Sequence, residues 1–300
     1  MPARLYTIEQ EKVFAQDYQN GLTCGQVALK HNVNRNTMIT ILRRQNVTFR
    51  LRQGDFKRIY TLDNTVFDDL NNEHACYWLG FLFADGFVSR NRNEIKLTLN
   101  NKDRIHVKMF NEFLKTDRMV RDAKIIYKGQ SLIVANTSVR DNHLANQLRK
   151  LGIEPTRPRP LVSLESIPIT MYHHWVRGWF DGDGSVTSIS KRNQLRLQFL
   201  GHHLLVDKVK NIFENELNTT RVSPTKVQTP HLRTLNYTSS SDIIKLHTYL
   251  YDGATTWLGR KRNKLDSWLI SQLREPLTRD AITASWIQSR IRDSLLRHNL

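Results

Sequence analysis

Two aspartates, each near the end of a similar apolar run, have the residue type and spacing best suited to chemistry. Asp85 lies in the run WLGFLFADG over residues 78–86, and Asp183 lies in the run VRGWFDGDG over residues 176–184. Each run predicts a helix with the acid in its last turn, where the helix dipole disfavours a carboxylate by about 0.3–1 kcal/mol. Two acids at equivalent, unfavourable positions indicate a ligand, and a divalent cation is the obvious candidate.

Small residues predict how the two helices approach each other. They lie four positions apart, on one helix face: Gly80 with Ala84, and Gly178 with Gly182. Such residues let helices pack closer than the usual axial distance of about 8–10 Å. The two carboxylates then meet and repel each other unless a proton or metal ion intervenes. Because Mg²⁺ prefers oxygen ligands, we predict that Asp85 and Asp183 are catalytic residues that hold Mg²⁺ or Mn²⁺. The alternative is two ordinary helix ends, each closed by a glycine.

The metal chemistry and the charge of the chain indicate a nucleic-acid substrate. A metal ion lowers the pKa of a bound water, orients it, and stabilises the leaving 3′ oxygen of a phosphodiester. The 300 residues carry a formal net charge of +17, which predicts a polyanionic partner. A basic protein without such a partner is the alternative.

The spacing of the acids reveals an internal repeat. They are 98 positions apart, and the segments that follow them are alike. Each half predicts the order helix, two strands, helix, two strands, helix, so we expect an α+β fold with pseudo-twofold symmetry. The expected ranges are 73–85, 87–92, 94–100, 102–115, 119–127, 130–138 and 141–151, then 171–183, 185–191, 193–201, 203–217, 221–228, 231–238 and 241–252.

The first hairpin of each half predicts a DNA-reading surface. Residues 95–99 and 195–199 alternate with period two, so one face is apolar and the other polar and basic. A two-stranded ribbon fits the major groove, where arginine pairs with guanine and glutamine with adenine. A solvated outer face is the alternative. The polar faces are predicted to include Ser89, Arg90, Arg92, Lys96, Thr98, Arg192, Gln194, Arg196 and Gln198.

The first fifty residues predict a separate three-helix unit. Thr7 with Gln10 and Thr23 with Gln26 form capping boxes, and Asn34 can cap a third helix. Apolar positions recur at helical spacing, Val13 among them. The pattern resembles a helix-turn-helix of resolvases and transposases, whose third helix enters the major groove; a small solvated bundle is the alternative. The predicted DNA-binding residues are Arg35, Asn36, Arg43 and Arg44, with Arg50 and Arg52 in the basic segment that follows.

These patterns predict five segments. They are a helix-turn-helix domain at 1–48, a basic linker at 49–70, half-domains at 71–160 and 161–265, and a basic helical tail at 266–300. Two cysteines cannot make a disulfide framework or a cysteine-based metal site. Without a signal peptide or a membrane-length apolar run, the sequence predicts a soluble intracellular protein.

Four histidines form the doublets His173-His174 and His202-His203. Adjacent side chains point to different faces, so neither doublet by itself makes a chelate. The sequence therefore predicts no metal-binding role for them.

The paired motifs resemble those of the LAGLIDADG homing endonucleases. The resemblance covers roughly residues 60–265 and includes the lead-in Leu62-Asp63, the segment 151–155 and the ending at 258–261. It implies saddle-shaped antiparallel sheets and double-strand cleavage across the minor groove, with short 3′ overhangs. It also implies a monomer that reads a long, non-palindromic site in double-stranded DNA.

The two halves depart from the family pattern in different ways. Phe83 stands where the second motif has an earlier acid, Asp181. The resemblance implies a catalytic lysine after the first half, where this chain has Arg157, whereas Lys261 stands in the comparable place of the second. Arginine is a poor general base, so the strands are expected to be cut at unequal rates.

Two other functions agree with the same sequence. Some relatives are transcription regulators with a helix-turn-helix and a LAGLIDADG domain that no longer cuts, but these tend to lose the final acids. Others are intron RNA maturases, which the sequence does not separate from endonucleases. Because both acids are present, we expect an endonuclease.

Overall fold

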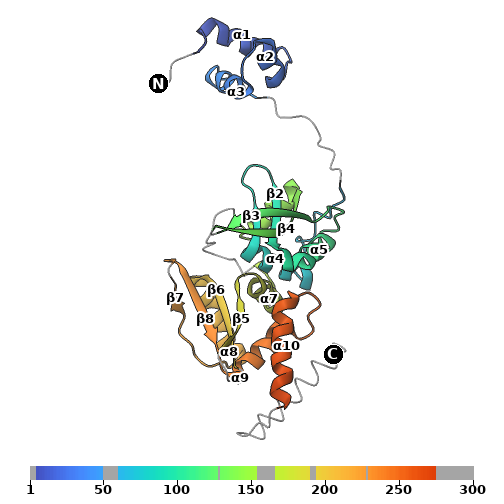
Figure 1. Ribbon diagram of the computed structural model, residues 1–300, viewed down its shortest axis with the longest axis vertical. Helices are drawn as coiled ribbons and strands as arrows, with labels where there is room; N and C mark the ends of the chain where they lie inside the picture. The colour runs from blue at the N-terminus through green and yellow to red at the C-terminus, as the bar shows by residue number, and fades with distance from the viewer. Residues whose placement is uncertain are drawn as a thin grey trace. The chain divides into compact units, whose positions relative to one another are not determined.

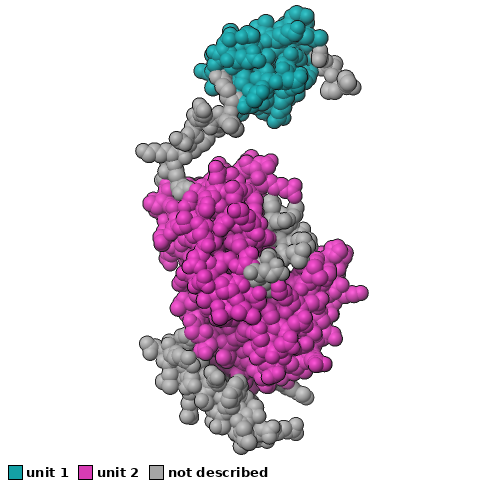
Figure 2. Space-filling model, turned by 180° about the vertical axis from the view of Figure 1, so that it is seen from behind, with its two compact units in different colours: residues 1–59 teal, residues 60–300 magenta. Residues whose placement is uncertain are grey.

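The computed structural model describes residues 5–49, 60–127, 129–153, 166–189, 194–227 and 229–274. The chain divides into two compact units between Ile59 and Tyr60 (Figure 2). Among the described residues, no helix is both long and apolar enough to cross a membrane.

The first unit is built from helices α1 (Ile8–Gln19), α2 (Cys24–Lys30) and α3 (Arg35–Arg44). The capping boxes at Thr7 and Thr23 are both present, and Asn34 caps α3 by accepting a hydrogen bond from the Asn36 amide at 2.8 Å. Val13, one of the apolar residues at helical spacing, is 52% exposed, whereas the neighbouring Phe14 is buried. The side chain that faces α2 and α3 is therefore one residue later than the helical pattern predicts.

The second unit contains two similar α/β halves. The first comprises α4 (Glu73–Asp85), β1 (Gly86–Val88), β2 (Glu94–Asn100), η1 (Asn101–Asp103), α5 (Arg104–Phe113), β3 (Arg121–Tyr127), β4 (Gln130–Arg140) and α6 (Asn142–Lys150). The second comprises η3 (Ile169–Met171), α7 (Tyr172–Asp183), β5 (Ser185–Ile189), β6 (Gln194–His202), α8 (His203–Leu217), β7 (Thr225–Lys226), β8 (Leu232–Tyr237), α9 (Ser240–Tyr251) and α10 (Gly259–Arg274).

Each half forms one antiparallel sheet around the shared pair of helices. The strand orders are β1-β2-β4-β3 and β5-β6-β8-β7, so the two sheets have the same topology. Helices α4 and α7 lie side by side between the sheets (Figure 1). The predicted α+β class with a tandem repeat is confirmed.

The hairpin between β1 and β2 closes earlier than the sequence pattern predicts. The Ser89 hydroxyl accepts hydrogen bonds from the amides of Arg92 (3.0 Å) and Glu94 (3.3 Å), which ends β1 at Val88. Ser89 is buried and holds this turn. Its predicted place on the polar DNA-reading face is therefore wrong.

Two predicted segment boundaries also move. Residues 60–70 belong to the second unit rather than to a linker, because Phe67 is 1% exposed and the Tyr60 hydroxyl accepts a hydrogen bond from the Arg140 amide at 2.7 Å. The boundary at 265/266 falls inside α10, which is one continuous helix. Residues 275–300 of the predicted tail lie outside the described residues.

Candidate active site at the ends of helices α4 and α7

Glycines bring α4 and α7 into direct backbone contact. A Cβ on Gly80 would lie 2.1 Å from the Trp175 carbonyl oxygen, and a Cβ on Gly178 would lie 2.0 Å from the Tyr77 carbonyl oxygen. The two contacts are related by the repeat, since both residues of one pair are 98 positions from those of the other. No larger side chain fits at either glycine while the helices keep this distance.

This packing brings the two motif acids to one end of the helix pair. Asp85 is the last residue of α4 and is partly exposed, while Asp183 is the last residue of α7 and is exposed. Asp85 Oδ2 lies 3.5 Å from the position of a Cβ on Gly182, the residue before Asp183. Both carboxylates also act electrostatically on the ammonium of Lys261. Solvent-accessible carboxylate oxygens at one place are the donor set that Mg²⁺ prefers.

The glycines after the acids end the helices by close approach, not by a left-handed conformation. Gly86 has φ −71° and Gly184 has φ −76°, both in ordinary regions of the backbone. A Cβ on Gly86 would lie 2.6 Å from the Leu82 carbonyl oxygen, and one on Gly184 would lie 2.6 Å from that of Phe180. Glycine therefore ends both helices, as considered from the sequence, with an extended backbone at each.

Lys261 supports the backbone on both sides of Asp183. Its side chain is 2% exposed and donates hydrogen bonds to the carbonyl oxygens of Phe180 (2.6 Å), Gly182 (3.4 Å) and Gly184. Burial lowers the pKa of Lys261 to about 8, although Asp181 and the two motif acids oppose the shift. The structure therefore shows the predicted catalytic residue Lys261 as a buried side chain whose three donors contact backbone carbonyls.

Asp181 is not a local cap but the centre of a buried network. It accepts hydrogen bonds from the hydroxyls of Tyr77 and Tyr251 (both 2.9 Å) and from the Leu258 amide (2.7 Å). Burial raises the pKa of its carboxyl, while Lys261 and these donors favour the charged form. The earlier acid of the second motif therefore joins α4, α7, α9 and the start of α10, away from solvent.

A second buried charge fixes the other end of the helix pair. The Arg177 guanidinium is completely buried, pairs with Glu73 at 2.7 Å, and donates to the carbonyls of Leu250 and Thr256 at 2.9 Å. A cation here is compatible with the interior because nearly all its donors have partners.

A cavity of about 240 Å³ lies beside Asp85 and adds cations to the candidate site. Its lining includes Lys102 and Arg260, together with Thr98 and Asn100 from β2. Arg260 is held there by Asp103, with Nε 3.0 and 3.1 Å from the two carboxylate oxygens. The sequence analysis missed Lys102 and Arg260 as site residues; the ending at 258–261 was the available signal for Arg260.

The described residues of the predicted DNA-reading hairpins lie in two kinds of place: Lys96, Thr98, Gln194, Arg196 and Gln198 are in strands β2 and β6, whereas Arg90 and Arg92 are in the turn between β1 and β2. Arg90, Arg92, Lys96, Gln194 and Arg196 are exposed, and Thr98 is partly exposed. Gln198 differs because its amide already donates to Asn236 at 3.0 Å and accepts from Ser185 at 3.4 Å. Arg157 and Arg192 lie outside the described residues.

The first unit presents part of its predicted basic face. Arg35, Asn36 and Arg43 on α3 are exposed. Arg44 is exposed as well, but it also forms an ion pair at 2.7 Å with Glu11, whose side chain is fully buried in α1. Arg44 therefore holds α1 and α3 together. Arg50 and Arg52 lie outside the described residues.

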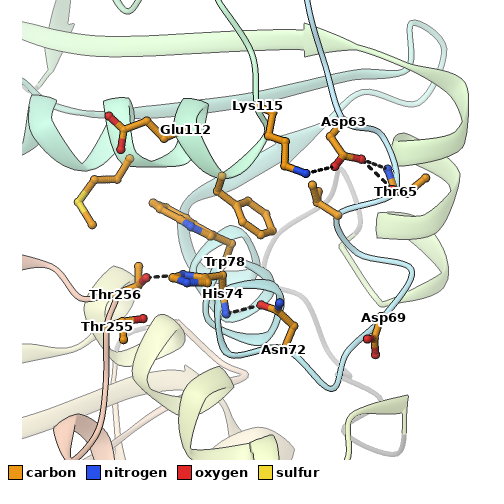
Figure 3. A pocket seen from close by; sticks show the side chains of 13 residues that line it. Asp63, Thr65, Asp69, Asn72, His74, Trp78, Glu112, Lys115, Thr255 and Thr256 are labelled. Atoms are coloured by element: carbon orange, nitrogen blue, oxygen red, sulfur yellow. Dashed lines mark hydrogen bonds and ion pairs between the residues drawn. The ribbon is translucent and has the colours of Figure 1, made fainter.

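A larger cavity, of about 590 Å³, lies at the opposite end of α4 from Asp85 (Figure 3). Its lining includes Asn72 and His74 at the start of α4, and Asp63, whose carboxylate pairs with Lys115 at 2.8 Å. Asn72 and Asp85 are thirteen positions apart along the helix, a rise of about 20 Å. This cavity is therefore not part of the two-acid site.

Comparison with known proteins gives structural likenesses at low identity. No protein-family model matches the chain, and no curated protein matches it. Among solved structures, it is similar to the LAGLIDADG meganuclease I-AabMI bound to uncleaved DNA, with 14% identity, a TM-score of 0.44, and coverage of 74% of this chain and 98% of that one. The chain resembles LAGLIDADG homing endonucleases.

Two further structures extend the comparison. I-SmaMI bound to an uncleaved DNA target in the presence of calcium ions has 17% identity and a TM-score of 0.42, with 74% of this chain and 98% of that chain covered. Full-length DUF199/WhiA from Thermatoga maritima has 16% identity and a TM-score of 0.42, with 78% and 74% covered. At these values function must come from the chain's own geometry.

Proposed function

We propose that this protein is a site-specific, metal-dependent endonuclease of double-stranded DNA. The observation that carries the proposal is the backbone contact at Gly80 and Gly178, which brings Asp85 and Asp183 to one end of the helix pair. When bound there, Mg²⁺ or Mn²⁺ would supply an activated water and stabilise the leaving oxygen. Each acid belongs to one half of the repeat, which suits cleavage of two strands related by the pseudo-twofold axis of a duplex.

The surroundings of the acids support a phosphodiester substrate. Lys102 and Arg260 line the cavity beside Asp85, where they can bind a backbone phosphate. Exposed residues for contacts to base edges are Lys96 and Arg196 on the strands and Arg92 in the turn between β1 and β2. Because the two faces differ in sequence, we propose a long, non-palindromic target read by one copy of the chain.

The first unit is proposed to add affinity as a helix-turn-helix. Its exposed residues Arg35, Asn36 and Arg43 lie on α3, the helix that occupies the major groove in that motif. Deletion of residues 1–50 is expected to weaken DNA binding while leaving weak cleavage of the central site. Cleavage equal to that of the full chain would contradict this role.

The nuclease proposal is tested with Asp→Asn variants. Duplexes bound by the full chain are first selected from a randomised pool without divalent metal, and a plasmid carrying the selected site is then incubated with Mg²⁺. Asp85→Asn and Asp183→Asn are expected to retain DNA binding and lose double-strand cleavage. Asp207→Asn, an exposed acid on α8, is the matched control and should cut normally.

The possible results distinguish a nuclease from a DNA-binding regulator and from an RNA maturase. Cleavage by both motif variants would overturn the metal-ligand assignment. Tight, selective binding by the wild-type chain without cleavage in Mg²⁺ or Mn²⁺ would instead indicate a DNA-binding regulator. Preference for a structured intron RNA over any duplex would indicate a maturase.

A further inference from the structure

Three histidines converge at the end of β6 in the second half. His202 is the last residue of β6 and is buried, His203 is the first residue of α8 and is partly buried, and His231 immediately precedes β8 and is exposed. One ring nitrogen from each lies within 4.8 Å of the other two. The first two are neighbours in sequence, but only the pairing of β6 with β8 brings His231 beside them.

The backbone around the three-histidine cluster is well defined. The amide of His203 donates to the carbonyl of His231 at 2.9 Å, which joins the start of α8 to the turn before β8. Arg233 supports the same turn by donating to the carbonyls of Pro230 (3.0 Å) and Leu232 (2.7 Å). The cluster therefore rests on two fixed backbone segments, and the neighbouring Arg233 guanidinium donates to carbonyl oxygens.

The first half of the repeat provides an internal comparison. Asn100 and His202 occupy equivalent positions, because each is the final residue of its strand paired with the fourth strand of its sheet. Asn100 caps the following helix by accepting from the Lys102 amide at 3.1 Å, whereas His202 makes the equivalent bond to the Leu204 amide at 3.4 Å. Asparagine is among the preferred N-cap residues and histidine is not. Capping alone therefore does not explain His202.

We propose that His202, His203 and His231 form a binding site for a divalent transition-metal ion, with Zn²⁺ as the best match. Neutral imidazole suits zinc and related ions, whereas Mg²⁺ prefers oxygen ligands. Three ligands at about 2.0–2.1 Å from zinc would stand about 3.3 Å apart in tetrahedral geometry. The nitrogens now lie within 4.8 Å of one another, so binding would require the rings to rotate toward the ion. A metal bound to Nε2 of His202 would leave the bond from the Leu204 amide to Nδ1 in place, whereas a metal on Nδ1 would replace it.

A metal ion bound to all three histidines would connect β6, α8 and the turn before β8. Three histidines leave one tetrahedral position for water. His202 lies on the same face of β6 as Arg196, because side chains alternate along a strand. The site is chemically distinct from the two-acid centre and requires no nuclease activity.

Cobalt and zinc titrations of the full chain test this site. Excess Mg²⁺ is present throughout, so that the carboxylates are occupied by a hard cation. We expect one equivalent of Co²⁺ to give the visible absorption of a tetrahedral complex, and Zn²⁺ to displace it. The variants His203→Gln and His231→Gln are each expected to weaken Zn²⁺ binding by at least about tenfold.

His143→Gln is the matched control, since His143 is exposed and pairs with Asp68 at 2.8 Å, outside the cluster. It should bind Co²⁺ and Zn²⁺ like the wild-type chain. Because His231 is exposed, its replacement is expected to leave the fold intact, which a circular dichroism spectrum checks. Absence of a Co²⁺ complex in the wild-type chain, or equal binding by His231→Gln and wild type, would overturn the proposal.

Discussion

Replacement of Gly178 by alanine gives the most direct test of how α4 and α7 position the acids. The new Cβ would lie 2.0 Å from the Tyr77 carbonyl oxygen and 2.8 Å from the Phe81 amide nitrogen. Both are backbone atoms, so neither can rotate away. Since ordinary contacts begin near 3.5 Å, the helices must separate by roughly 1.5 Å at this point.

That separation has two measurable costs. Overpacking of a close interface lowers the free energy of unfolding by about 1–3 kcal/mol, although the better helix propensity of alanine offsets about 1 kcal/mol of this. A displacement of about 1 Å at a reacting centre reduces a rate by up to about 100-fold. We therefore expect Gly178→Ala to lose more in cleavage than in stability.

The assay compares Gly178→Ala with Gly259→Ala. A Cβ on Gly259 meets no atom within 4 Å, so this variant makes the same chemical change in the same unit without a collision. Denaturant unfolding gives the stability of each variant, and cleavage of the selected duplex in Mg²⁺ gives its rate. If Gly178→Ala matched Gly259→Ala in both measurements, the close packing would not be what positions the acids.

Three further predictions concern the buried ionisable side chains of the second unit. Lys261→Met removes the ammonium that donates to three carbonyls around Asp183, so the free energy of unfolding should fall by about 1–3 kcal/mol and the cleavage rate should fall with it. Lys264→Met, an exposed change on the same helix, should alter neither quantity. Arg177→Met leaves the Glu73 carboxylate without its ion pair and should cost about 3–5 kcal/mol in denaturant unfolding; a double variant with Glu73→Gln should recover part of this loss, and no recovery would argue against the pair. Burial lowers the pKa of His106 to about 3 from 6.5, so between these pH values the unfolded chain binds a proton that the folded chain does not. The free energy of unfolding should therefore fall as the pH drops from 6.5. His106→Gln should make the free energy of unfolding depend less on pH than it does in the wild type.

Much of the fold follows from local sequence patterns. The predicted helix 73–85 is α4, and the predicted helix 203–217 is α8, with the same bounds. Capping boxes and period-two alternation report local backbone geometry, so they can be read from neighbouring residues. The strand at 221–228 was predicted too long, because β7 covers only Thr225–Lys226. Among the described residues of this segment only these two pair with β8, and the extent of pairing is not visible in the residue types.

The roles of individual site residues were less predictable. Lys261 had the right type for catalysis but contacts carbonyls about eighty positions earlier in the chain. Arg260 is oriented by Asp103, 157 positions away. Gln198 and Arg44 look like exposed DNA contacts in the sequence, yet each has a partner from another element. Such contacts cannot be predicted from residue type and spacing, because the contacts depend on which surfaces meet after folding.

The sequence by itself determined the repeat, the paired acids and the small residues that allow two helices to touch. These features are periodic or local, so they can be recognised without knowledge of the fold. Only the tertiary structure decided that Asp181 is buried among tyrosines, that Lys261 supports the backbone around Asp183, and that His231 joins His202. The physical reason is that burial and pairing set the chemistry of a side chain, and both are properties of the folded chain.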